Sequence, residues 1–220
     1  MAGVLSDGAT ERRARRMGYR RRGILDAAAR VFADVGYERA TLEGIGEAVG
    51  LSKTSLYYYV RSKEDLLARL LTEVTDEIGR QAAAGLPVDA PAGERLWAFV
   101  RAHVRVVCTT PAGRVLARNQ DVVLGEASSR MMREARRRHE RLLRSILAQG
   151  IGDGVFRPID VRVGSSLILG ALNVAGRWDS PEGAVAADRI AEELFTMVVG
   201  GIAAHPGEAA ATGTGAADAQ

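Results

Sequence analysis

The segment 41–63, TLEGIGEAVGLSKTSLYYYVRSK, constrains the possible folds more than any other part of the sequence. Apolar residues recur in its first half with helical spacing, and Thr41 before them is a residue type that caps helix N-termini. Gly50 can adopt the left-handed backbone that ends a helix, and Ser52 can cap a second helix over residues 53–59. The segment therefore predicts two short helices joined by a tight turn.

The second of these helices is predicted to be amphipathic. Leu56 and Val60 lie four residues apart and can both face the first helix, which leaves a lysine, hydroxyls and phenols on or near the other side. Such side chains bind phosphate oxygens and base edges when a helix lies in the major groove of DNA. The predicted DNA contacts are Thr41, Ser52, Lys53, Thr54, Ser55, Tyr57, Tyr58 and Lys63, with Arg20 and Arg21 from the basic segment before them.

The charge distribution supports this interpretation. Residues 1–63 hold 12 of the 30 Lys and Arg residues but only 7 of the 27 Asp and Glu residues, a net charge of +5, while the remaining residues carry −2. Much of the excess lies at Arg12–Arg16 and Arg20–Arg22. We predict residues 1–19 to be a disordered basic arm that lies along phosphates or enters the minor groove. The alternative is a solubilising tail or a transit peptide.

A further helix is predicted from Ile24 to Val35, ended by Gly36. The order AAARVFADVGYERATLEGIGEAVGLSKTSLYYYVRSKEDLL, within about residues 24–67, resembles the N-terminal domain of the TetR family of transcriptional repressors. The elements that agree in order are Phe32, Gly36-Tyr37, Thr41, Ile45, Gly50-Leu51-Ser52, Leu56-Tyr57 and Ser62-Lys63-Glu64.

Three positions depart from the family pattern. Gly44 and Gly46 stand where the family more often has a polar residue and alanine, and Val60 stands where it usually has phenylalanine. Glycine inside a helix costs about 1 kcal/mol relative to alanine. We therefore expect the first helix of the pair to be less rigid than is usual in the family.

The rest of the chain is predicted to be helical, since no alternating strand pattern of useful length is present. Ser62 and Asp65 form a cap before a long helix that reaches about residue 84. Proline and glycine separate further predicted helices at residues 91–108, 111–119, 125–149, 159–178 and 181–203. The predicted fold is all-α, with a three-helix DNA-binding domain at 20–66, a helical ligand-binding and dimerisation domain at 67–203 and a disordered tail at 204–220.

The last two predicted helices carry a wide apolar face with small residues, which lets helix backbones approach closely. This face either closes the core of a monomer or pairs with a second copy. In the resembled family these helices form a four-helix bundle between subunits, which implies a homodimer whose recognition helices lie about 34 Å apart on a palindromic operator. The predicted interface residues are Val163, Leu167, Gly170, Ala171, Val174, Trp178, Ile190, Leu194 and Val198.

Residues 170–183, GALNVAGRWDSPEG, resemble a segment of TetR-type repressors associated with fatty-acid, acyl-coenzyme A and steroid breakdown. This resemblance implies a small hydrophobic or acyl-CoA-type effector that releases the protein from DNA. The predicted ligand-binding residues are Trp97, Arg101, His103, Val104, Val107, Asn119, Gln120, Val123, Leu169, Asn173 and Arg177. For Asn173, Arg177 and Trp178 the alternative is a structural role at a corner of the dimer interface.

The histidines of this region are predicted to differ in burial. His103 lies among apolar residues, and we interpret it as an interior or pocket-edge residue rather than a metal ligand, since no second ligand stands at suitable spacing. Segment 133–144, REARRRHERLLR, mixes both signs of charge beside an apolar stripe. It is interpreted as a solvated outer face with His139 at the surface, and a second nucleic-acid patch is the alternative.

Motifs of several other protein classes are missing from the sequence. It contains no G-x-S-x-G, no H-E-x-x-H and no phosphate-binding glycine loop, so we expect no catalysis, no cofactor and no metal. No apolar run approaches the ~20 residues of a membrane span, which predicts a cytoplasmic protein without a membrane partner. The alternatives to a metabolite-responsive repressor are an efflux-pump regulator that responds to amphipathic drugs, a helical small-molecule-binding protein or enzyme, and an architectural DNA-binding protein indifferent to sequence.

Overall fold

The computed structural model describes residues 4–87, 89–119, 122–177 and 184–203. This part of the chain forms helices joined by short loops, and its one β-type contact is an isolated antiparallel bridge between Phe156 and Ala203. The all-α prediction is confirmed. The helices are α1 (Val4–Val35), α2 (Leu42–Ala48), α3 (Lys53–Tyr57), α4 (Lys63–Ala83), α5 (Ala92–Thr109), α6 (Pro111–Arg118), α7 (Glu126–Gly152), α8 (Val161–Ala175) and α9 (Ala184–Ile202).

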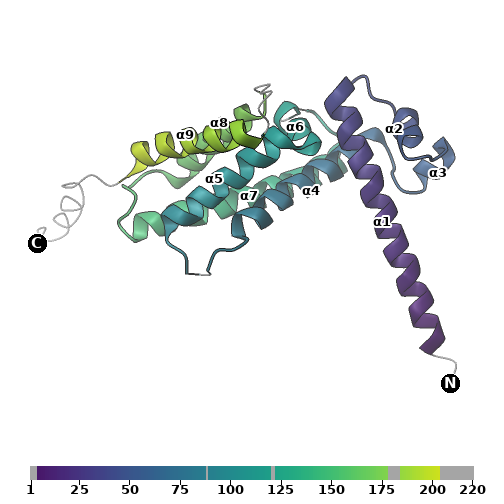
Figure 1. Cartoon of the computed structure of the whole chain (residues 1–220), viewed down its shortest axis with the longest axis horizontal. Coiled ribbons are helices and arrows are strands. Elements are labelled where there is room, and N and C mark those ends of the chain that lie inside the picture. Colours follow the sequence, from purple (N-terminus) through teal and green to yellow (C-terminus); the bar gives the residue numbers. More distant parts are fainter. Residues whose placement is uncertain (1–3, 88, 120–121, 178–183, 204–220) are drawn as a thin grey trace, which may run out of the picture.

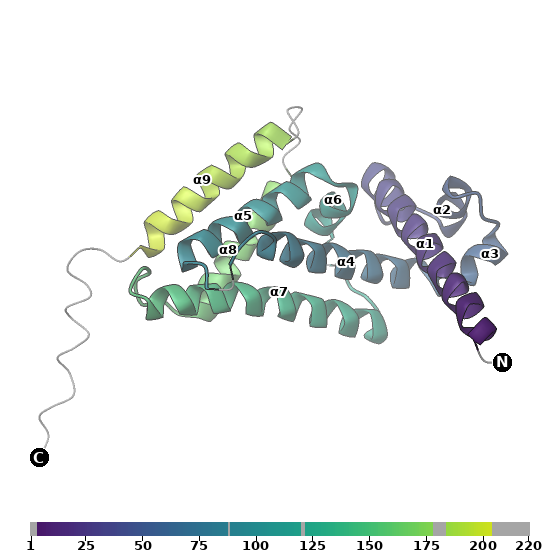
Figure 2. The ribbon, with the colours of Figure 1, turned by 60° about the horizontal axis from the view of Figure 1, so that its bottom comes forward.

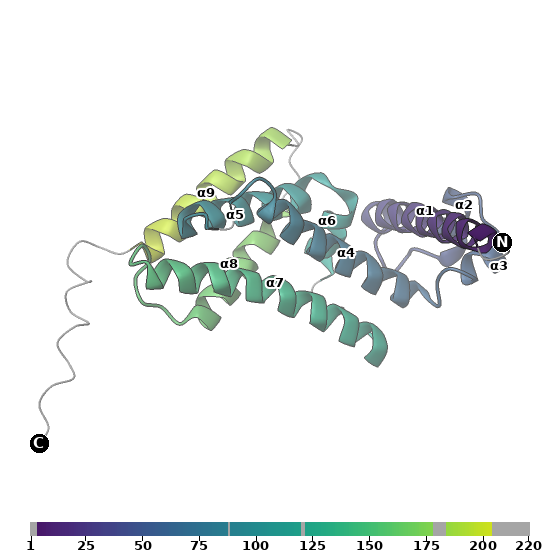
Figure 3. The same cartoon turned by 90° about the horizontal axis from the view of Figure 1, so that it is seen from below.

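The helices form two parts, which we call the head (α1–α3) and the body (α4–α9) (Figure 1). In the body α4 packs on both α5 and α7. Contacts follow the same order along α4 and α7, from Glu64 with Gly125 to Asp76 with Arg138, so the two helices run parallel. Figures 2 and 3 show α9 on the side of α5 away from α7. The head joins the body through α4 and through packing of α6 on α1.

Local side-chain caps fix the helix-turn-helix as predicted. The hydroxyl of Thr41 accepts a hydrogen bond from the amide of Gly44 at 3.1 Å, and that of Ser52 accepts one from Ser55 at 3.2 Å. Gly50 between them has φ +65°, the left-handed conformation expected of a glycine that ends a helix. The second helix ends at Tyr57, two residues earlier than predicted.

Gly46 allows the two helices to approach closely. Its carbonyl accepts a hydrogen bond from the amide of Leu51 at 2.9 Å, and a Cβ atom at this position would lie 2.9 Å from the Leu51 carbonyl oxygen. A backbone atom cannot move aside as a side chain can, so any larger residue would push α2 from the turn. The departure from the family pattern at Gly46 therefore has a packing function, whereas a Cβ at Gly44 would meet only the Thr41 hydroxyl at 3.4 Å.

The basic segment is helical rather than disordered. Helix α1 begins at Val4, twenty residues before the predicted start at Ile24, and it continues without a break to Val35. Arginine and alanine are strong helix formers, and no proline interrupts them, so the segment extends the helix that starts the head. The prediction of a disordered arm is wrong for residues 4–19, while residues 1–3 and the predicted tail 204–220 lie outside the described residues.

The body helices agree with their predicted ends to within three residues. Ser62 caps α4 by accepting a hydrogen bond from the amide of Asp65 at 3.0 Å, as its sequence pattern indicated. Aliphatic and aromatic side chains of α4, α5 and α7 fill the interior; among the largest are Leu71, Phe99 and Leu147. Among the described helices, none is long and apolar enough to cross a membrane.

Candidate DNA-binding face and ligand site

Helix α3 exposes the polar face that the sequence predicted. Leu56 and Val60 are 1% and 4% exposed and pack into the head, whereas Tyr57 and Tyr58 are 49% and 65% exposed. Thr54 and Ser55 are also exposed. Each phenol combines an apolar ring with a hydroxyl, and their position on a helix-turn-helix suits contacts with a groove of DNA.

Lys53 is held by a neighbouring carboxylate. Its ammonium forms an ion pair with Glu43 of α2, and both side chains are exposed. The hydrogen bond from Lys53 lowers the pKa of Glu43, and the same bond raises the pKa of Lys53. An exposed pair of this kind contributes little to stability, so Lys53 can exchange Glu43 for a phosphate when DNA is present.

Lys63 forms hydrogen bonds with backbone carbonyl groups of the head. Its ammonium donates to the carbonyl oxygens of Tyr37, Glu38 and Ala40 at 2.9, 3.1 and 3.1 Å, and it lies 4.5 Å from the centre of the Tyr37 ring. A lysine has three donors, and all three are used here. These bonds tie the start of α4 to the turn between α1 and α2, and the DNA contact of Lys63 stays a prediction.

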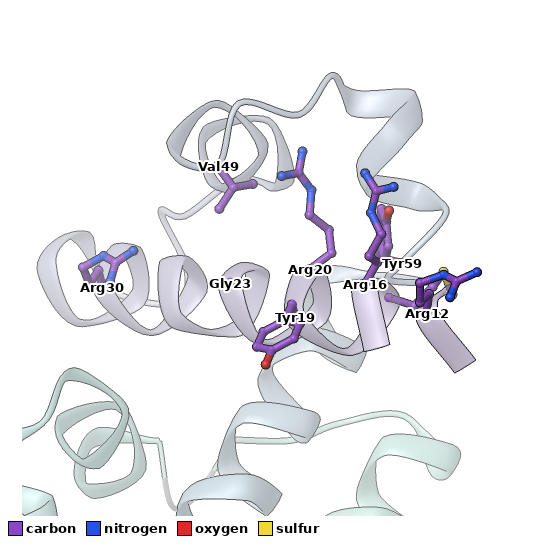
Figure 4. A pocket seen from close by; sticks show the side chains of 9 residues that line it. Arg12, Arg16, Tyr19, Arg20, Gly23, Arg30, Val49 and Tyr59 are labelled. Carbon is purple, nitrogen blue, oxygen red and sulfur yellow. The ribbon is translucent and has the colours of Figure 1, made fainter. Parts of the chain in front are cut away.

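The arginines of α1 face different surroundings. Arg12, Arg16 and Arg20 line an open groove of about 1140 Å³ between α1 and the helix-turn-helix, together with Val49 and Tyr59 (Figure 4). Arg12 and Arg16 belong to the basic arm that was predicted to lie along phosphates, whereas Val49 and Tyr59 were not predicted as groove residues. The four-residue spacing of Arg12, Arg16 and Arg20 was a signal for a common helix face.

Arg21, the second arginine predicted to bind DNA, lies over a different hollow. It lines a smaller cavity of about 170 Å³ with Arg69 and Glu73 of α4. Arg20 and Arg21 therefore line different hollows, because adjacent residues of a helix point about 100° apart.

A buried polar cluster lies in the core of the body. His103 is 1% exposed; its Nε2 lies 3.0 Å from Oδ1 of Asn173 on α8, and its Nδ1 lies 3.1 Å from Nε2 of His139 on α7. The amide oxygen only accepts, so His103 donates from Nε2 and accepts from His139. Nδ1 of His139 is then left as a buried acceptor without a hydrogen-bond partner among the described residues.

Both histidines are neutral at physiological pH. Burial, followed by the charge of His139, lowers the pKa of His103 to about 3, against a smaller opposing effect of the hydrogen bond with Asn173. Burial lowers the pKa of His139 to about 4. The cluster can therefore bind a polar group by hydrogen bonds, but it offers no charge to an anion.

His139 is 9% exposed, so its predicted surface position is wrong. The apolar residues Met132, Ala135, Leu143 and Ile146 form the buried stripe of α7, and position 139 lies in the middle of that stripe. The charged residues on both sides of His139 made its place in the apolar stripe hard to recognise in the sequence. Helical spacing alone would have placed the histidine in the core.

Only part of the predicted ligand site comes together. Val104 and Val107 are fully buried on α5 near His103, and Leu169 is half-buried on α8, the helix of Asn173. Trp97 instead packs on Phe195 of α9 with ring centres 5.2 Å apart. Arg101 pairs with Asp188 of α9 at 3.3 Å, so both side chains serve the contact between α5 and α9.

The remaining predicted ligand residues lie near the ends of α6 and α8. Asn119 caps α6 by donating to the Val115 carbonyl at 2.8 Å, and Val123 is 94% exposed. Arg177 donates to the carbonyl of Ala117 at the end of α6, 3.2 Å away, which is a structural role on a neighbouring helix. Gln120 lies outside the described residues.

The predicted dimer face is exposed and apolar. On α8, Val163, Leu167 and Val174 are 56%, 70% and 44% exposed, and Gly170 and Ala171 beside them are exposed too. On α9, Ile190, Leu194 and Val198 are partly buried, while Met197, which was not predicted, is 72% exposed. Trp178 lies outside the described residues. Such an apolar face on two neighbouring helices is typical of a helical interface between subunits.

Comparisons with known proteins agree with this architecture. Residues 24–70 match the family described as "Bacterial regulatory proteins, tetR family", and residues 89–202, more than half of the chain, match "Tetracyclin repressor-like, C-terminal domain". The chain is 27% identical over 191 residues to the HTH-type transcriptional repressor KstR2 of Mycolicibacterium smegmatis, with 86% of this chain and 93% of that protein covered.

Two solved structures are similar over most of their length. The ketosteroid transcriptional regulator KstR2 of Mycobacterium tuberculosis has a TM-score of 0.69 and 26% identity, with 84% of this chain and 96% of that chain covered. AibR, solved in complex with isovaleryl coenzyme A and operator DNA, has a TM-score of 0.70 and 26% identity, with 81% and 97% covered. The chain belongs to the TetR family of bacterial regulatory proteins.

Proposed function

We propose that this protein is a homodimeric transcriptional repressor that leaves a palindromic operator when a small hydrophobic or acyl-CoA-type ligand binds. The observation that carries the proposal is α3, whose exposed hydroxyls and phenols project from a helix-turn-helix fixed by its own caps. Thr54, Ser55 and Tyr57 on this helix, with Tyr58 directly after it, contact base edges and phosphates. Lys53, Ser52 and Thr41 add contacts at its edge.

The second subunit covers the apolar face of α8 and α9. Leu167 and Met197 are the most exposed large apolar residues of this face, and a second copy removes both from water. Two-fold pairing then presents two copies of α3 to half-sites about one helical turn apart, which makes the operator palindromic.

The ligand binds in the body, where the polar cluster of His103, His139 and Asn173 lies within an apolar core. A site with apolar walls and a few fixed polar groups suits a hydrophobic metabolite. Nδ1 of His139 is an acceptor, so the ligand presents a hydroxyl or an amide N–H to it. Support for an acyl-CoA-type ligand comes from AibR, which binds isovaleryl coenzyme A.

Hydrogen bonds at the end of α6 connect this core to the head. Arg177 after α8 donates to Ala117, and the next residue, Arg118, donates to the carbonyl of Ala33 in α1 at 3.2 Å. A ligand that displaces α8 therefore moves α6 and changes how α1 is held. The ligand can release DNA only if it binds the displaced arrangement more tightly than the DNA-bound one.

Selection of bound duplexes from a random pool at fixed salt tests the proposal, with and without isovaleryl coenzyme A. We expect a palindromic consensus and a loss of binding when the ligand is added. The variant Arg177→Gln should keep the consensus and respond less to the ligand. A pool that shows no enrichment would contradict a sequence-specific regulator.

The family assignment also bears on the remaining predictions. We propose that the protein is not an enzyme and that it acts in the cytoplasm, where its DNA is. The alternative of a sequence-indifferent architectural protein predicts affinity that follows salt and not sequence, and the same selection distinguishes the two.

A further inference from the structure

The N-terminal half of α1 extends beyond the rest of the head (Figure 1), and its arginines form two sets. Arg12, Arg16 and Arg20 follow one another at intervals of four residues and share one face of the helix. All three line the groove between α1 and the helix-turn-helix, and Figure 4 shows Arg16 and Arg20 directed to the helix-turn-helix side of α1. Neither Arg15 nor Arg22 lines this groove.

The two sets also differ in their charge environment. Burial raises the pKa of Glu73 on α4, and the charge of Arg22 opposes that rise, so Arg22 lies near carboxylates of the body. In the part of the chain that the structure describes, no carboxylate forms an ion pair with Arg12, Arg16 or Arg20. The groove therefore has a concentrated positive charge that no carboxylate among the described residues neutralises.

The helical state of this segment limits what it can bind. An α-helix with side chains is about 10 to 12 Å wide, whereas the minor groove of DNA is only about 6 Å wide. A helical segment cannot enter the minor groove as an extended arm does. It can lie along the sugar-phosphate backbone, where arginine forms paired hydrogen bonds with phosphate oxygens.

We propose that the face of α1 with Arg12, Arg16 and Arg20 is a second DNA-backbone site, which takes phosphates into the groove beside α3. The three guanidinium groups span about 12 Å of helix, and the same length of duplex carries about seven phosphate charges. The hydroxyl of Tyr59, which lines the groove too, adds a neutral donor. These contacts add affinity equally for all sequences, since phosphates carry no sequence information. This inference rests on the proposed function in one respect: duplex DNA is the partner.

Two double variants with the same charge change test the site. R16Q/R20Q removes two groove arginines, and R15Q/R22Q removes two arginines outside the groove; glutamine and arginine have similar helix propensities. We expect the salt dependence of log K to become flatter by about 1.8 in R16Q/R20Q, because each phosphate contact contributes about 0.9. At 0.1 M salt this corresponds to about 60-fold weaker binding. R15Q/R22Q should stay within about 0.5 of the wild-type slope.

The measurements use the full dimer with its selected operator and with a scrambled duplex of the same length. Equal loss on both duplexes supports a backbone site, and R16K/R20K, which keeps the charge, should retain the slope. If the salt slope becomes flatter by the same amount in R16Q/R20Q and R15Q/R22Q, or in neither of them, the proposed site is wrong. Circular dichroism confirms that each variant keeps its helices.

Failure of this site can be separated from failure of the proposed function. If the wild-type protein shows no preference for the selected operator, sequence-specific regulation fails, yet the slopes on any duplex still report on the groove. A third outcome is that R16Q/R20Q loses binding to vesicles with phosphatidylserine but not to DNA. That result assigns the groove to a lipid surface and overturns the proposal.

Discussion

The polar side chains of α3 and those of the body core lie in opposite environments. Tyr57 and Tyr58 are exposed at the tip of the head, whereas His103 and His139 lie in the interior of the body and bond to each other. In the head, local caps and two buried aliphatic side chains hold the exposed groups in place. In the body, three helices from distant parts of the chain must pack together before the histidines meet.

This difference teaches that the two proposed sites depend on the fold in different ways. The DNA-binding face depends mainly on the folding of the head, because its caps and turn are made by residues close in sequence. The polar cluster exists only when α5, α7 and α8 are correctly packed, so it reports on any rearrangement of the body. Substitutions in each region should therefore give distinct results.

Leu56→Ala should have the largest effect and should act through the head. The side chain is 1% exposed, so its truncation lowers the free energy of unfolding by about 2 to 5 kcal/mol. Urea denaturation measures the loss, and Thr54→Ala on the exposed face should change stability by less than about 0.5 kcal/mol. Equal stability of the two variants would mean that α3 packs through another face.

Acid should destabilise the body through its histidines. Because the folded pKa values of about 3 and about 4 lie below the unfolded value of about 6.5, the unfolded state binds protons first and stability falls below pH 6.5. Each histidine contributes a loss of about 2 kcal/mol between pH 7 and pH 5. His139→Gln should halve this dependence in denaturation curves. A pH dependence that is the same in His139→Gln and in the wild type would show that His139 is not buried in its neutral form.

Lys63→Met should weaken the joint between head and body. The change removes the donor from two partly buried carbonyl oxygens and one exposed carbonyl oxygen, and we expect a loss of about 1 to 3 kcal/mol in the free energy of unfolding. If these three bonds persist in the complex with DNA, the salt dependence of DNA binding should stay unchanged. A slope flatter by about one would restore Lys63 to the list of DNA contacts.

Replacing Gly46 or Gly44 of α2 by alanine should change the free energy of unfolding in opposite directions. Gly46→Ala places a methyl group 2.9 Å from the Leu51 carbonyl oxygen and should cost about 1 to 2 kcal/mol, with weaker DNA binding. Gly44→Ala has room beside Thr41 and should add up to about 1 kcal/mol, because alanine favours the helix. Thermal denaturation compares both variants, and a stabilising Gly46→Ala would contradict the close approach of the turn.

Sequence patterns were sufficient wherever the deciding contacts are local. The caps at Thr41, Ser52 and Ser62, the break at Gly50 and the helix ends of the body follow from residues at most four positions apart. The exposed face of α3 follows from the spacing of Leu56 and Val60. Each of these features depends on backbone geometry that repeats every turn.

Predictions that needed distant contacts were incomplete or wrong. Lys63 was assigned to DNA because its charge stands beside α3, but carbonyl oxygens more than twenty residues earlier bind it. Trp97 and Arg101 were assigned to a pocket, although both face α9. Side-chain direction in these cases depends on which helix packs alongside.

The sequence by itself determined an all-helical chain with a helix-turn-helix near its start and an apolar face near its end. Helix caps, glycine turns and the helical repeat act over a few residues, so they are already specified before the chain folds. The tertiary structure alone decided that His103, His139 and Asn173 meet and that the arginines of α1 divide between two surfaces. Both outcomes depend on close packing of helices that are far apart in the chain, and packing is selected by the whole fold.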